Sequence, residues 1–346
     1  MHAAKKNKLC PELQVHGTKM EKVDEDTYLG DIISADGKNT KNLKNRISKG
    51  LGIISQIMNI LESVTLGEHF FSTAVLLRES LFINGILTNC EIWYGLNKSE
   101  IHELESLDRN LLCKILNTPF STPSESLYLE LGIMDIGSII KTRRINYLHY
   151  LSTRKETEML FQVFSAQWRY PTNKEDWTEM VWKDLVDFGI PVDLEFIRSK
   201  SKLTFKNMVK IKSKEFSFFK FMKEKEKHSK MANLWYSDLK MENYLNSNKF
   251  TVKQSQTIFS FRTRMANFQE NFRNGNGHLP CPLCLIHMDS QSMAFQCPKV
   301  KIEVNIEGKY EELWTDEISS KLCNTLSNIV KYRESYLAER KVQQVK

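Results

Sequence analysis

Apolar residues recur at helical spacing along most of this 346-residue chain. The clearest stripe is Leu43, Ile47, Leu51, Ile54, Met58 and Leu61, whose steps of three and four residues predict one buried face of a helix. Arg46 and Lys49 fall off this stripe and are expected to face away from the core. The same spacing predicts helices over 68–87, 99–116, 138–151 and 247–272, and a mainly helical stretch over 178–246 with a break at 189–191.

A different pattern occupies residues 11–36, where short β-like runs are bounded by Gly and Asp turns. We therefore expect a mainly α fold: a helical bundle with a small N-terminal β element and a short cysteine-bearing turn near the C-terminus. The expected segments are a tail (1–15), the strand and helical bundle (16–152), a linker (153–177), a basic helical region (178–273), the cysteine segment (274–300) and a helical tail (301–346).

The composition limits the cellular compartments in which we expect the protein. The longest apolar runs, such as residues 50–60, are far too short to span a membrane, and the first residues lack the apolar stretch of a secretory signal. Seven cysteines, an odd number, are spread thinly over the chain and do not form the dense pattern of a disulfide scaffold. A reducing cytoplasm or nucleus, without membrane insertion, is the expected location.

Positive charge is concentrated in one region. The whole chain carries a net charge of +7, whereas residues 198–230 alone contain twelve Lys or Arg against three Glu. Basic side chains neutralise a polyphosphate and aromatic side chains stack on unpaired bases. Nucleic acid binding and a solvated helix face with a phenylalanine core both remain open. The interleaved aromatic residues are Phe205, Phe216, Phe218, Phe219 and Phe221.

The cysteines of the segment CPLCLIHMDSQSMAFQC, residues 281–297, have the spacing of a metal site. A tight turn brings Cys281 and Cys284 together, and Cys297 lies on the return. His287 or His278 could supply a fourth ligand. The pattern leaves a zinc site, a weak degenerate site and no metal site as alternatives. No general base accompanies the cysteines, so any zinc here would be structural.

Four segments resemble, in order, the region downstream of the polymerase domain in non-LTR (LINE-type) retrotransposon reverse transcriptase proteins. They are VDEDTYLGDIISADGKNTKNLKNRISKG (23–50), CEIWYGL (90–96), ILNTPFSTPSESLYLELGIMDIGSIIKTRRINYL (115–148) and FSFRTRMANFQENF (259–272). Together they cover most of 15–150 and 255–300, and the region between matches only loosely. The resemblance implies a thumb-like helical bundle that grips nucleic acid through its backbone rather than its bases. The contact candidates are Lys141, Arg143, Arg144, Lys206, Lys210, Lys212 and Lys214.

The resemblance also implies a zinc knuckle, with Asp289, Ser290 and Gln291 matching the stretch after its first cysteine pair. The position four residues before Cys297, where the family carries histidine, is Met293. A thioether is a poor ligand for zinc.

A second departure concerns catalysis. The family polymerase holds two divalent ions with paired aspartates, and this chain contains no Asp-Asp dipeptide. We therefore expect no enzymatic activity and no small-molecule substrate: a truncated reverse-transcriptase-related protein that binds RNA or DNA. The alternatives are a non-catalytic helical protein-interaction module, a decayed fragment without a selected function, and an enzyme that completes its site with another chain.

Overall fold

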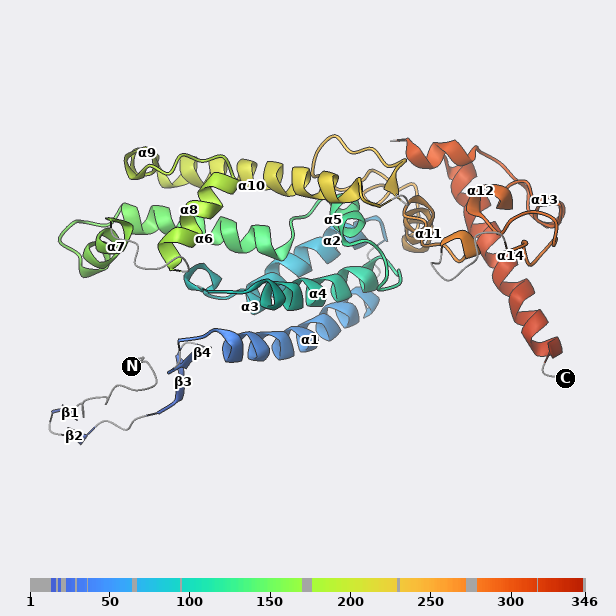
Figure 1. Ribbon diagram of the computed structural model, residues 1–346. Helices are drawn as coiled ribbons and strands as arrows, with labels where there is room; N and C mark the ends of the chain where they lie inside the picture. Colours follow the sequence, from blue (N-terminus) through green and yellow to red (C-terminus); the bar gives the residue numbers. More distant parts are fainter. Residues whose placement is uncertain are drawn as a thin grey trace. The chain divides into compact units, whose positions relative to one another are not determined.

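The computed structural model is mainly helical, with short paired strands near the N-terminus, as the sequence predicts (Figure 1). Cysteines lie near the C-terminus, also as predicted. It describes residues 14–16, 18–19, 23–28, 30–35, 37–63, 67–93, 95–169, 176–228, 231–271, 279–315 and 317–344. The chain divides into two compact units, each assembled from segments that are distant in sequence. Unit 1 is drawn from 1–56, 78–108 and 134–216, and unit 2 from 57–77, 109–133 and 217–346.

Two antiparallel strand pairs belong to unit 1. β1 (Gln14–Val15) pairs with β2 (Thr18–Lys19), and β3 (Glu25–Tyr28) pairs with β4 (Asp31–Ser34). The register of the second pair places Tyr28 opposite Asp31, so a tight turn joins the strands. Gly30 lies in this turn with φ of +85°, a conformation that glycine adopts readily. The β3–β4 hairpin leads directly into the first helix (Figure 1).

Helices form the rest of both units. The α-helices are α1 (Thr40–Ser63), α2 (Phe70–Leu77), α3 (Asn84–Ile86), α4 (Lys98–Ile115), α5 (Ser124–Leu131), α6 (Ile136–Ser152), α7 (Met159–Arg169), α8 (Trp177–Asp187), α9 (Leu194–Ser199), α10 (Lys202–Lys225), α11 (Val252–Arg262), α12 (Gln291–Ala294), α13 (Pro298–Glu303) and α14 (Ser320–Gln344). Shorter turns are η1 (Gly67–His69), the π-helical η2 (Arg78–Ile83), η3 (Cys90–Ile92), η5 (Gln269–Asn271) and η6 (Tyr310–Trp314).

The buried face of α1 agrees with the predicted stripe at Leu43, Ile54 and Leu61, which are 2 %, 2 % and 3 % exposed, and differs from it at other positions. Leu51 is 51 % exposed, whereas Arg46, expected to face outward, is 5 % exposed. Arg46 is buried because its guanidinium donates a 2.7 Å hydrogen bond to the carboxylate of Asp31. Gly50 also faces inward, and a Cβ there would lie 2.5 Å from Leu107 Cδ2. Close approach at Gly50 and a buried ion pair at Arg46 therefore add two positions to the inner face that apolar periodicity does not predict.

The predicted linker contains a helix. α7 occupies residues 159–169, and its Phe164 is buried in the core of unit 1. The hydrophobic residues of this core are Ile145, Leu148, Leu151, Phe164, Val181, Leu185, Phe188, Ile190, Ile197, Phe205 and Val209. The predicted helix over 247–272 is shorter than expected, because α11 ends at Arg262. Residues 231–250, expected to be mainly helical, contain no α-helix.

Unit 2 contains a buried polar network around Glu130, which is 0 % exposed. Arg262 donates to Glu130 at 3.0 Å and to Glu242 at 3.2 Å, and the hydroxyl of Tyr236 donates to Glu130 at 2.8 Å. Burial and the negative charge of Glu130 raise the pKa of Tyr236 well above its ordinary value. A buried charge is tolerated only when paired in this way, so the network fixes α5, α11 and the 236–242 segment to one another.

Replacing Asp31 with Asn is expected to make the stability of unit 1 less dependent on pH. Burial opposes ionisation of Asp31, but hydrogen bonds from Arg46, Asn89 and Asn42 outweigh it and hold its pKa below the ordinary value of 3.8. A lowered pKa gives the folded state stability that is present above 3.8 and is lost as the pH falls through the folded pKa. Urea unfolding of the variant should therefore differ most from the parent at neutral pH, with the difference shrinking at about pH 3. An equal difference at both pH values would contradict this account.

Within the described residues, no helix is long and apolar enough to cross a membrane.

Candidate metal centre and basic helix face

The cysteine segment folds as a small knuckle in unit 2. The amide of Cys281 donates to the carbonyl of His287 at 2.6 Å, and the amide of Asp289 donates to the carbonyl of Leu279 at 2.9 Å. Between these two bonds the chain reverses tightly, with the amide of Leu285 donating back to the carbonyl of Cys281 at 2.8 Å. This turn places the side chains of its two cysteines on the same side.

Three sulfur atoms converge at the knuckle. The Sγ atoms of Cys281, Cys284 and Cys297 all lie within 4.8 Å of one another, and those of Cys281 and Cys297 are 4.0 Å apart. Four sulfurs bonded tetrahedrally to zinc at about 2.3 Å would be about 3.8 Å apart. The trio is therefore positioned to bind a metal ion, as the cysteine spacing predicts. Cys281 and Cys297 are buried, whereas Cys284 is partly exposed.

No imidazole joins the three sulfurs among the described residues. His287, predicted as the fourth ligand, contributes its backbone carbonyl to the knuckle, and its ring is not part of the converging group. The other candidate, His278, lies outside the described residues. Met293 is half-buried on α12. The part of the chain that the structure describes therefore brings together three ligand atoms of the four that a structural zinc site uses.

A hydrogen-bonded shell fixes the knuckle to α14. Asp289 is 4 % exposed and accepts two hydrogen bonds from Arg333, at 2.8 and 3.1 Å. Further along α14, Arg340 donates to the carbonyl of Pro282 at 3.2 Å, and Ser290 accepts the Met293 amide as the N-cap of α12. Sequence reasoning matched Asp289 to a family pattern but missed Arg333. The available sequence signal for Arg333 was indirect: a buried carboxylate such as that of Asp289 requires a positively charged partner, but the sequence does not say which residue provides it.

The thiols of the knuckle differ in acidity. Burial opposes ionisation of Cys284, but backbone amides of His287 and Ile286 outweigh it and lower the pKa of this thiol. Burial raises the pKa of Cys297 to about 11. A metal binds the thiolate form, and Cys284 loses its proton more easily than Cys297.

The basic region folds as α10, and three of its lysines form a row. Lys206, Lys210 and Lys214 are exposed and follow one another at intervals of four residues, which places them about 6 Å apart along one side of a helix. None of the three forms an ion pair with a described residue. Lys212 lies off the row and pairs with Glu215 at 2.8 Å.

The phenylalanines of this region serve mainly as core. Phe205 and Phe221 are 1 % and 2 % exposed, and Phe216 packs against the core of unit 1. Phe218 is half-buried, and Phe219 is 67 % exposed. The phenylalanine-core interpretation is therefore confirmed for three of the five positions.

Two of the predicted contact residues on α6 are paired inside unit 1. Arg144 is 4 % exposed and lies 3.2 Å from a carboxylate oxygen of Asp184. Lys141 lies 3.8 Å from the other Asp184 oxygen, also pairs with Asp187, and sits over the ring of Phe216 at 5.1 Å. α8 supplies the counter-charge of Arg144 and the fold buries it, so a nearby acidic side chain accounts for this positive charge, and contact of Arg144 with an external phosphate stays a prediction.

Arg143 is half-buried, and its guanidinium is also engaged. It donates to the carbonyl of Leu87 and to the side-chain oxygen of Asn84, both at 2.7 Å. These bonds tie α6 to the end of α3. Arg143 therefore has a structural role, and the lysine row of α10 carries the exposed positive charge among the predicted contacts.

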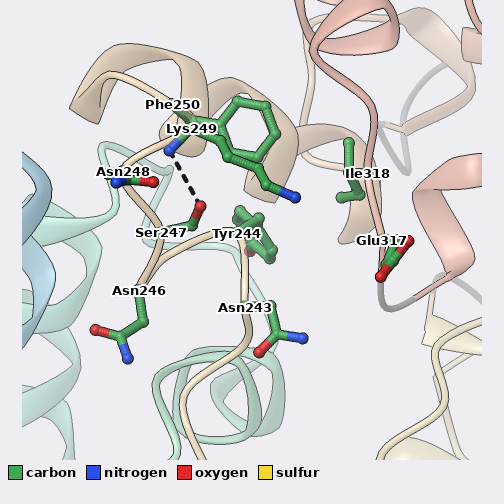
Figure 2. Close-up of a pocket in the computed structure, with 9 residues that line it drawn as sticks. All are labelled: Asn243, Tyr244, Asn246, Ser247, Asn248, Lys249, Phe250, Glu317 and Ile318. Carbon is green, nitrogen blue, oxygen red and sulfur yellow. Dashed lines mark hydrogen bonds between the residues drawn. The ribbon is translucent and has the colours of Figure 1, made fainter.

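Unit 2 also contains an open cavity of about 470 Å³ (Figure 2). Its lining residues are Asn243, Tyr244, Asn246, Ser247, Asn248, Lys249, Phe250, Glu317 and Ile318. The loop is held by a 3.1 Å bond from the Lys249 amide to the Ser247 hydroxyl. The asparagine side chains and the opposite charges of Lys249 and Glu317 suit a small polar molecule. The lining residues include neither an imidazole nor a thiol, so they do not indicate covalent chemistry.

No family model, curated protein or solved structure matches the chain.

Proposed function

We propose that this protein binds the phosphate backbone of a nucleic acid through the lysine row Lys206, Lys210 and Lys214 of α10. The row carries the proposal because its three ammonium groups are exposed and form no ion pair with a described residue. Their spacing of about 6 Å along the helix is similar to the distance between successive phosphates of an extended strand. Lysine binds phosphate as a point charge, so the row supports affinity rather than base recognition.

The three cysteines complete this proposal with a structural zinc ion. Cys281, Cys284 and Cys297 would hold the ion, and the ion would brace the knuckle that Asp289 anchors to Arg333 of α14. The resemblance to the region after the polymerase domain of LINE-type reverse transcriptases supports the same interpretation. Under it the protein grips RNA or DNA and carries out no polymerisation, since the paired aspartates are missing from the chain.

Salt-dependent binding of single-stranded RNA tests the proposal. If three phosphates are neutralised, the logarithm of the association constant should fall against the logarithm of salt with a slope of about −2. Fluorescence anisotropy of a labelled oligonucleotide between about 50 and 200 mM salt measures this slope. Binding that is undetectable at the lowest salt concentration would overturn the proposal.

A protein-interaction module is the second candidate, and the same helix provides its observation. Leu203 and Ile211, beside the lysine row, are 69 % and 58 % exposed. A face with both apolar and basic side chains fits an acidic amphipathic helix of a partner protein. Absence of RNA binding, combined with binding of such a peptide that weakens on Ile211→Ser substitution, would favour this alternative.

A further inference from the structure

The cysteine trio has the arrangement of an oxidisable thiol set as well as that of a metal site. Cys284 is partly exposed, so a small oxidant in solvent reaches it directly, whereas Cys281 and Cys297 are buried beside it. The sulfur of each buried cysteine lies within 4.8 Å of the Cys284 sulfur. A disulfide requires about 2.05 Å between sulfurs, which side-chain rotation within a short loop can supply.

We propose that the metal-free cluster is a thiol oxidation site, at which a peroxide oxidises Cys284 and a buried cysteine of the trio resolves it as an intramolecular disulfide. The inference rests on the same three sulfurs as the proposed metal centre. It is independent of the lysine row and of nucleic acid binding.

The reaction is balanced with peroxide as the oxidant. The Cys284 thiol gives up its proton and the thiolate attacks one peroxide oxygen; the O–O bond breaks, the proton goes to the leaving oxygen, and a sulfenic acid and one water are formed. The thiol of Cys281 or Cys297 then attacks the Cys284 sulfur, its proton passes to the departing oxygen, the S–O bond breaks, and a second water leaves. Two thiols have lost two electrons and two protons, and one peroxide has become two waters.

Oxidation and metal binding exclude each other at this cluster. A disulfide removes two of the three sulfur donors, and a bound ion occupies the electron pairs that would attack the peroxide. The oxidised knuckle would stay closed by a covalent bond in place of the ion, with its anchor from Asp289 to Arg333 intact. A bound ion would therefore protect the trio from peroxide, and a trio that has formed a disulfide would no longer take up the ion.

The other described cysteines provide internal controls. Cys90, Cys113 and Cys323 are buried and lie outside the trio. Burial raises the pKa of Cys90 and of Cys323 to about 12, which disfavours the reactive thiolate form.

The test uses the full chain with Cys10, which lies outside the described residues, replaced by Ser. Metal-free and zinc-loaded protein are treated with hydrogen peroxide and analysed by intact mass and peptide mapping. The metal-free chain should lose two hydrogens, link Cys284 to Cys281 or Cys297, and recover its mass with dithiothreitol. Cys284→Ser should slow disulfide formation at least about tenfold, since the accessible thiol is gone, while Cys113→Ser should leave it unchanged.

Three results would overturn the inference: further oxidation of Cys284 without a disulfide, a disulfide outside the trio, or wild-type disulfide formation in Cys284→Ser. The zinc-loaded sample separates this inference from the metal proposal. A trio disulfide in a chain that retains no zinc would uphold the oxidation site and remove the metal centre. Retained zinc in a chain that forms no disulfide when metal-free would do the reverse.

Discussion

Replacing Lys206, Lys210 and Lys214 together with Glu is expected to reduce RNA affinity at least about tenfold at about 50 mM salt and to bring the salt slope close to zero. The three side chains lie on one side of α10 and form no ion pair with a described residue, so reversing their charge removes the proposed phosphate contacts and adds repulsion. Anisotropy titrations at several salt concentrations measure both quantities. Circular dichroism should be unchanged, because exposed helix positions tolerate Glu as well as Lys.

Two matched variants make this experiment specific. Lys→Arg at the same three positions keeps the charge and should keep the salt slope. Charge reversal at Lys44, Lys49 and Lys299, which are also exposed, changes the net charge by the same amount on other helices or turns. If this dispersed variant weakens binding as much as the row variant does, the total charge of the chain and not the α10 row determines affinity.

Replacing Cys281 with Ser is expected to lower bound zinc from about one ion per chain to a small fraction of that value. Cys281 is buried within the trio, and only two sulfurs would remain to hold the ion. Elemental analysis of protein purified without chelator measures the metal content. Thermal unfolding should show the parent losing stability on chelation, while the variant responds little.

Cys113→Ser is the control for this substitution, since Cys113 is a buried thiol of unit 2 outside the trio. It should retain zinc like the parent. Equal, near-zero zinc in parent and Cys281→Ser would remove the metal proposal. Zinc retained at the parental level by Cys281→Ser would instead show that the ion binds somewhere else.

Periodicity predicted the mainly helical fold because the buried positions of α4, such as Leu104, Leu107 and Leu111, follow helical spacing closely. It missed two positions on the inner face of α1, because periodicity counts apolar side chains and does not detect a glycine used for close packing or an arginine buried by a distant aspartate. The residues concerned are Gly50 and Arg46. Contacts with residues distant in sequence, Leu107 for Gly50 and Asp31 for Arg46, determine the burial of both.

In the candidate site, too, features set by residues close in sequence could be predicted, and features set by residues distant in sequence could not. Cys281 and Cys284 lie in one turn, so local spacing was enough to predict their convergence. The role of Arg144 depended on Asp184, forty residues further along the chain, and that of Asp289 on Arg333 in the last helix. A charge pattern shows which residues are basic and gives no information about which of them already have a counter-ion.

The discontinuous composition of unit 2 constrains how the molecule can be made on the ribosome. Residues 57–77 and 109–133 emerge early, yet their unit also requires residues 217–344. Leu322, Leu326 and Ile329 of α14 are 0 % exposed, and α14 packs against α11. α11 must therefore wait, with apolar surface uncovered, until α14 has left the exit tunnel. A premature stop before α14 would leave that surface permanently open to chaperones and proteases.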